Sequence, residues 1–314
     1  MERVGLPVSS QAPGRGWPRA AGLFGVTLAA SVVQPSVLVA VPFLILTAVR
    51  GLRGAGLFIG AALASVLAVS GPQDGFWFME RGWAVLVGGG FVGVTMAAPD
   101  WRLSARLLMA VAVAFAVSVV VIVARDGSWQ TVDFAVTNAV EGGVATTLQA
   151  VELLRGGDAI SPALAAAIHQ TARAQVDVFP ALMAIASMAG LAVAWWLYVR
   201  LRGGGDQAVG PVKHFRFNDH LVWLLIVGLL MLVTRWGDAI ARVGSNAVVF
   251  MGALYALRGS AVFMFISGGL SLFGYVMLAI ALVLAAPVVV GVAMVVGIGD
   301  TWFDVRERLR ETAV

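Results

Sequence analysis

The fold is decided by residues 247–298, which read AVVFMGALYALRGSAVFMFISGGLSLFGYVMLAIALVLAAPVVVGVAMVVGI. A helix needs roughly 20 consecutive apolar residues to cross a bilayer, and this stretch is long enough for more than one crossing. It carries one charged residue, Arg258, within the polar break Leu257-Arg258-Gly259-Ser260, and a weaker break lies at Ser267-Gly268-Gly269. We therefore predict a broken helix or hairpin and then a long helix, over residues 247–257, 260–270 and 272–298.

The composition of the whole chain agrees with a membrane protein. Of its 314 residues 60% are hydrophobic and 12% are charged, whereas soluble domains carry about 25% charged residues. Earlier apolar blocks lie at residues 20–33, 37–49, 55–70, 82–98, 104–124, 179–199 and 221–235. The sequence predicts an all-α, polytopic transmembrane helix bundle with about eight crossings. The first two blocks are short for a membrane span. They form either two tilted spans or one re-entrant hairpin about Gln34-Pro35.

Basic residues indicate the orientation, because cytoplasmic loops of membrane proteins are enriched in Lys and Arg. With the N-terminus inside, most of the 21 basic residues fall on the cytoplasmic side, and the C-terminus is cytoplasmic as well. The expected parts are a disordered cytoplasmic tail, N-terminal transmembrane helices, an extramembrane amphipathic helical hairpin, C-terminal transmembrane helices and an interfacial tail helix, at residues 1–19, 20–125, 126–178, 179–300 and 301–314.

The expected hairpin rests on local signals. Apolar residues recur every three to four positions from Val132 to Val151, which is the pattern of an amphipathic helix. Gly156-Gly157-Asp158 breaks this pattern, and Ser161-Pro162 supplies an N-cap and a first-turn proline for a second helix.

Motifs for catalysis are missing from the sequence. There is no cysteine, and the single lysine, Lys213, follows Gly-Pro-Val rather than a phosphate-binding loop. The three histidines lack the spacing of metal ligands on one helix, and no serine nucleophile elbow is present. We expect no enzymatic activity, no metal and no cofactor. The net charge of +4 reflects the bias of the cytoplasmic loops rather than nucleic-acid binding.

Polar residues at membrane depth are the candidates for a ligand site, because they are costly there. Asn246 and Arg258 bracket the predicted half-helix 247–257, and Arg235 ends the preceding span. The ends of a broken helix can line a binding cavity. The alternative is that Asn246 caps the half-helix and Arg258 snorkels to the outer interface.

Two further features of the sequence suggest a functional or structural role. Ala21, Gly25 and Ala29 form a small-residue ridge that could dock a partner or pack internally. In the tail, Asp300 is expected to cap the last helix and Asp304 to pair with Arg308.

Several short motifs resemble the YybS-like family of bacterial membrane proteins. They are Val41-Pro42-Phe43, Arg50-Gly51-Leu52-Arg53-Gly54, Phe179-Pro180, Asn246, Leu254-Tyr255-Ala256-Leu257-Arg258-Gly259 and the closing Gly299-Asp300-Thr301-Trp302-Phe303-Asp304-Val305-Arg306. That family is distantly similar to the S subunits of energy-coupling-factor transporters and to MreD. The resemblance implies an S-subunit-like core, in which Pro42, Gly259, Asp300 and Arg306 belong to structural motifs. It also implies that the ridge on the first helix docks a transport module.

Two functions follow as hypotheses. The first is a non-enzymatic protein of the bacterial cytoplasmic membrane that captures a small ligand and passes it to a partner ATPase module. The second is a membrane scaffold of a cell-envelope complex without a ligand. A cavity lined by Asn246 and Arg258 would favour the first hypothesis, and a filled core with an exposed apolar groove would favour the second.

Overall fold

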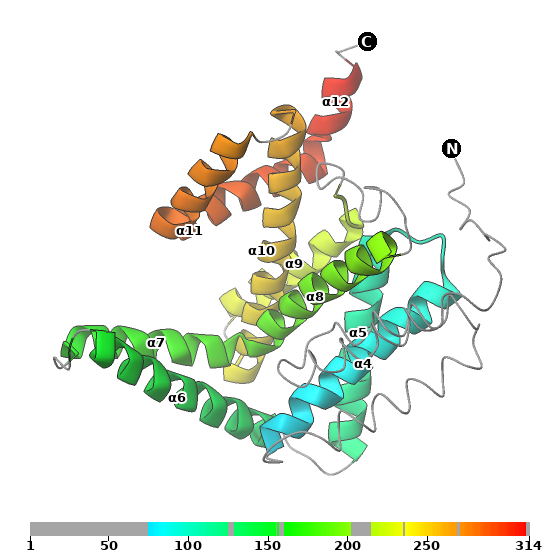
Figure 1. The fold of residues 1–314 in the computed structure, drawn as a ribbon. Helices are drawn as coiled ribbons and strands as arrows, with labels where there is room; N and C mark the ends of the chain where they lie inside the picture. The colour runs from blue at the N-terminus through cyan, green and yellow to red at the C-terminus, as the bar shows by residue number, and fades with distance from the viewer. Residues whose placement is uncertain are drawn as a thin grey trace. The chain divides into compact units, whose positions relative to one another are not determined.

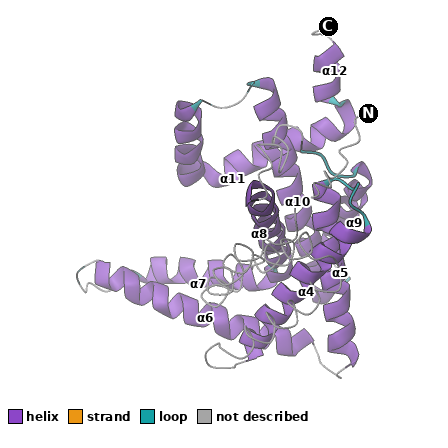
Figure 2. Ribbon diagram, turned by 45° about the vertical axis from the view of Figure 1, so that its right-hand side comes forward, coloured by secondary structure: helices purple, strands orange, loops and turns teal. Residues whose placement is uncertain are grey.

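The computed structural model describes residues 75–124, 129–154, 156, 160–201, 215–234, 236–268 and 271–311. Most of these residues lie in helices, and none of them lies in a strand (Figure 2). The helices are α4 (Gly75–Ala97), α5 (Leu103–Ala124), α6 (Trp129–Leu154), α7 (Pro162–Asp177), α8 (Phe179–Leu201), the short 3-10 helix η4 (Asp219–Leu221), α9 (Val222–Thr234), α10 (Asp238–Ile266), α11 (Leu272–Phe303) and α12 (Val305–Glu311). The predicted all-α class is confirmed.

Four of these helices, α5, α8, α10 and α11, are long and apolar enough to cross a membrane. Shorter apolar helices cover Gly82–Ala97 and Asp219–Thr234. Each matches an apolar block seen in the sequence. The blocks at 20–33, 37–49 and 55–70 lie outside the described residues, so the total of about eight crossings stays a prediction.

The chain divides into two units. The first consists of residues 1–142 and 186–208, and the second of residues 143–185 and 209–314. In the first unit α4 and α5 pack against each other. A Cβ added to Gly90 would lie 3.5 Å from the carbonyl oxygen of Ala110, so the two backbones come close together there.

Helix α10 is the centre of the second unit and packs against both α9 and α11 (Figure 1). A glycine of α10 lies at its crossing with α9 and another at its crossing with α11. A Cβ on Gly244 would lie 2.7 Å from the carbonyl oxygen of Gly228 in α9, and a Cβ on Gly259 would overlap the carbonyl oxygen of Ala293 in α11. Close approach through small residues is the main source of helix association in lipid, where no hydrophobic force drives helices together.

The break predicted at residues 257–260 was wrong. Helix α10 runs without interruption from Asp238 to Ile266, so the half-helices 247–257 and 260–270 do not exist. Gly259 is the site of a helix crossing rather than a break, and close packing against α11 compensates for its low helix propensity. The chain breaks instead at the weaker signal, where Ser267 is the C-cap and Gly268 has a φ of 68°.

The long helix predicted over 272–298 begins at Leu272 but differs in two ways. It bends, because Ala285 leaves the helical conformation shortly before Pro287. A proline inside a helix lacks the N–H donor and its ring clashes with the preceding turn. The helix also continues to Phe303 and ends at Asp304, which has a φ of 45°. Asp300 therefore lies inside α11 and does not cap the tail helix α12.

The helices predicted within 126–178 are confirmed, and their place outside the membrane stays a prediction. Helix α6 ends at Leu154, and Gly156 follows with a φ of 74°. Ser161 accepts a hydrogen bond from the backbone N–H of Leu164 at 3.3 Å, and Pro162 occupies the first turn of α7. The sequence predicted both the break at Gly156 and the cap at Ser161 correctly, because caps and turns depend on neighbouring residues only.

Candidate functional site

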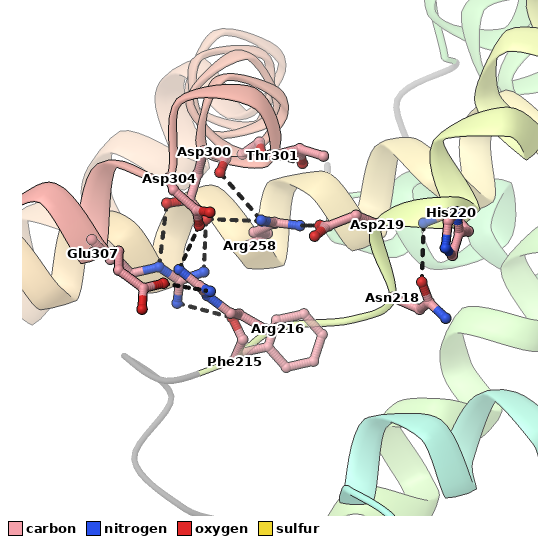
Figure 3. Close-up of polar contacts among 12 residues, drawn as sticks. Phe215, Arg216, Asn218, Asp219, His220, Arg258, Asp300, Thr301, Asp304 and Glu307 are labelled. Atoms are coloured by element: carbon pink, nitrogen blue, oxygen red, sulfur yellow. Dashed lines mark hydrogen bonds and ion pairs between the residues drawn. The ribbon is translucent and has the colours of Figure 1, made fainter.

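A cluster of charges joins three parts of the second unit, and we call it the Arg258 cluster; three of its members are buried and the fourth, Asp219, is exposed. It consists of Asp219 of η4, Arg258 of α10, and Asp300 and Arg306 of the C-terminal helices (Figure 3). The Arg258 side chain is 1% exposed and the Asp300 side chain is fully buried. An isolated charge buried in this way would be very costly, so the pairing offsets the cost of burying Arg258 and Asp300.

The guanidinium of Arg258 donates hydrogen bonds to several acceptors. Its Nε donates to Asp300 Oδ2 at 2.9 Å, and its Nη2 donates to the backbone oxygen of Asp300 at 3.2 Å. Its Nη1 donates to Asp219 Oδ1 from the opposite side (Figure 3). The ring of Phe217 lies 5.5 Å from the guanidinium carbon. These contacts satisfy both the charge and the fork geometry of the arginine.

Arg306 completes the cluster. Its Nη2 donates to Asp300 Oδ2 at 2.8 Å, and its Nη1 donates to the backbone oxygen of Phe215 at 3.0 Å. The left-handed residue Asp304 changes the direction of the chain between α11 and α12, and Arg306 lies within hydrogen-bond distance of Asp300. Asp300 thus lies between two guanidinium groups, and Asp219 supplies the second negative charge.

An exposed set of ion pairs surrounds the buried one. Arg216 lies 2.8 Å from the carboxylate of Asp304 and 3.5 Å from that of Glu307. The structure therefore pairs Asp304 with Arg216 rather than with Arg308, which the sequence suggested. Such exposed pairs contribute little stability.

A second cluster lies near the start of α10 and holds it to the junction of α7 and α8. Asn246 Oδ1 accepts a hydrogen bond from the backbone N–H of Ala181 at 2.9 Å, and its Nδ2 donates to the backbone oxygen of Asp177 at 2.9 Å. Arg242 donates to the backbone oxygens of Val176 and Asp177. Asn246 is thus a cap, as one reading of the sequence had it, but it caps α8 instead of its own helix.

The residues predicted to form a ligand site are not brought together. Asn246 and Arg258 lie on one continuous helix, about 18 Å apart at 1.5 Å per residue, so they do not face one ligand. Arg258 does not snorkel to the surface. Arg235 lies outside the described residues, as do Ala21, Gly25, Ala29 and Pro42.

Sequence reasoning missed the partners of Arg258. Between Val243 and Gly299, Arg258 is the one charged residue. A charge in such a stretch requires an opposite charge from a neighbouring element, and Asp219 and Asp300 both lie at edges of apolar segments. That signal was present in the sequence, although it does not say which acid is the partner.

The Arg258 cluster is suited to fastening helices rather than to chemistry. Its carboxylates are bound to arginines, and within the described residues no three His, Asp or Glu side chains gather as metal ligands do. What the geometry provides is a strong, directional connection between α10, the end of α11, and the segment that precedes α9.

Comparison with known proteins identifies a family. Residues 21–301 match the model of the family DUF2232, described as "Predicted membrane protein". No curated protein and no solved structure matches the chain. The likeness to YybS-like proteins, S subunits and MreD is tested by neither result and stays a prediction. Since the family model covers most of the chain, and since several helices can span a bilayer, the chain belongs to the DUF2232 family of predicted membrane proteins.

Proposed function

We propose that this membrane protein is a non-enzymatic scaffold of a cell-envelope complex in a bacterial cytoplasmic membrane. The observation that carries the proposal is that Asn246 and Arg258, the polar side chains predicted to line a ligand site, are bonded to groups of the chain itself. Both amide hydrogens and the carbonyl oxygen of Asn246 have backbone partners. The charge of Arg258 is neutralised by Asp300. A site for a polar ligand needs polar groups that can turn to the ligand, and these groups fasten helices instead.

A scaffold also needs surface that other proteins can reach within the membrane. The part of α11 before the bend at Ala285 exposes large apolar side chains at successive positions, among them Phe273, Val276, Val283 and Leu284. This part bends away from α10 (Figure 1). A helix that is apolar on all sides is stable only inside a bilayer or against other helices, and we infer that a partner's transmembrane helix packs here.

Photo-crosslinking in living cells tests this proposal. A photoreactive amino acid at Val283, which is 85% exposed, should give a discrete adduct with one other membrane protein. The matched control is Val120 of α5, an exposed apolar residue on another spanning helix, which should give lipid adducts alone.

Lipid adducts alone at Val283 would contradict the scaffold proposal. Native mass spectrometry of the purified protein supplies the opposing outcome. A small organic solute, other than a phospholipid or phosphate, retained at one copy per chain would replace the scaffold by ligand capture for a partner ATPase module.

A further inference from the structure

Arg106 in α5, in the first unit, is a buried cation without an anionic partner among the described residues. Its side chain is 8% exposed, and its Nε is enclosed with no hydrogen-bond partner. The ion pairs of the described residues include Arg216, Arg258 and Arg306, but none includes Arg106. Asp100, the acidic residue nearest in sequence, is exposed and forms no ion pair with it. Arg258, by contrast, is also buried but is paired with two carboxylates.

The surroundings of Arg106 hold the guanidinium in place without neutralising it. Its central carbon lies 4.5 Å from the centroid of the Trp195 ring in α8. Trp195 is itself fixed by the edge of Phe91 in α4 and by Tyr198, with ring centroids 6.0 Å and 5.4 Å away. A cation over an aromatic face recovers part of the cost of burial. It supplies no negative charge to the guanidinium.

The position along α5 favours an anion as well. Helix α5 begins at Leu103 and has no acidic residue in its first turn to offset the positive end of the helix dipole. Exposed Trp101 and Arg102 directly precede it. Tryptophan and arginine at the end of a spanning helix mark the membrane interface, which is where the phosphates of lipid headgroups lie.

We propose that Arg106 binds a phosphate group at the N-terminal end of α5, either the headgroup phosphate of an anionic phospholipid or a free phosphate ion. The guanidinium matches two phosphate oxygens with two parallel N–H donors, while Trp195 supports its face. A bound phosphate removes the cost of a buried, unpaired charge. The proposal does not depend on the scaffold function.

The test compares the whole protein with Arg106→Gln and with Arg102→Gln, which removes an exposed arginine one turn earlier. Each protein is measured in neutral detergent with chloride alone, with added phosphatidylglycerol, with added phosphatidylcholine, and with inorganic phosphate. We expect phosphatidylglycerol or phosphate to raise the Tm of the wild type and of Arg102→Gln by several degrees, and to leave Arg106→Gln unchanged. In chloride alone Arg106→Gln should melt at or above the wild type, because it buries no unpaired charge.

The separate additions of lipid and of inorganic phosphate show where the bound phosphate group comes from. A Tm rise with phosphatidylglycerol together with one retained lipid in native mass spectra assigns the site to a lipid headgroup. A rise with phosphate but not with the lipid assigns it to the free ion. An equal response of the wild type and Arg106→Gln to both anions overturns the proposal.

The test does not depend on one variant being folded. Arg106→Lys keeps the charge but loses the fork, and it should retain a reduced response. If Arg106→Gln does not fold, the response of the wild-type protein to the lipid and to phosphate tests the proposal by itself. A wild-type protein that retains no anionic lipid and shows no Tm shift with either anion also overturns the proposal.

Discussion

Arg258 and Asp300 show how a charge is accommodated inside an apolar helix. The buried carboxylate of Asp300 accepts hydrogen bonds from both Arg258 and Arg306. Removing one member of a buried ion pair leaves a charge without compensation, which is much more costly than loss of an exposed pair. The two carboxylates Asp300 and Asp304 lie four residues apart and provide this comparison within one chain.

Asp300→Asn keeps the shape of the side chain and removes its charge. We expect it to lower the free energy of unfolding by about 3–5 kcal/mol, because two buried guanidinium groups lose their shared partner. The control Asp304→Asn removes an exposed partner of Arg216 and should cost less than about 1 kcal/mol. Denaturant unfolding of both purified variants in the same detergent measures the difference. Equal destabilisation would mean that Asp300 is not buried between the arginines.

At the scale of elements, glycines determine how closely the helices of the second unit approach. Gly259 and Gly297 face each other where α10 crosses α11, and a Cβ on either would overlap a backbone carbonyl of the other helix. Backbone atoms cannot rotate away as side chains do, so the helices would have to separate. Gly252 is on the same helix, but its nearest neighbour is the flexible end of Met294, with the sulfur 3.5 Å from a built Cβ.

Gly259→Ala should therefore destabilise the protein by about 1–3 kcal/mol or more through overpacking. Gly252→Ala should change stability by less than about 1 kcal/mol, because alanine favours the helix and the methionine can move. Thermal melts of the two variants side by side give the answer. A tolerated Gly259→Ala with a damaging Gly252→Ala would refute this helix crossing.

The elements also show how far the sequence could predict this fold. Apolar length, the cap at Ser161 and the turn at Gly156 depend on adjacent residues, and the helices they mark were predicted well. Arg258-Gly259 was misread because an arginine and a glycine in an apolar helix look like a break. Their role depends on Asp300 and Ala293 in another helix. The candidate site failed for the same reason, since no local pattern shows which distant group satisfies a buried charge.

At the scale of the whole molecule, the two clusters bear on the topology. The Arg258 cluster joins the segment before α9 to the end of α11, and both segments were predicted to be cytoplasmic. Asn246 joins the start of α10 to the junction of α7 and α8, and both were predicted to lie outside. The contacts of Asn246 join segments expected on the same face. Arg258, however, was expected at the outer interface, and its ion pairs with Asp219 and Asp300 are incompatible with that position if the segments of these two acids are cytoplasmic.

Cysteine labelling of intact cells tests the orientation, since the chain has no cysteine of its own. Glu152→Cys, exposed at the end of α6, should react with a membrane-impermeant maleimide added outside. Glu311→Cys, exposed in α12, should react only after the membrane is permeabilised. The opposite pattern would invert the topology.

We propose that Asn246 and Arg258 fasten α10 to its neighbours rather than bind a ligand. A double-mutant cycle on Arg258→Met and Asp300→Leu, measured by denaturant unfolding of the purified protein, tests it most directly. If the two side chains are partners, the double variant should be less destabilised than the sum of the single variants, with a coupling energy of about 2–3 kcal/mol. Additive effects within about 0.5 kcal/mol would contradict the claim, because Arg258 would then not depend on Asp300.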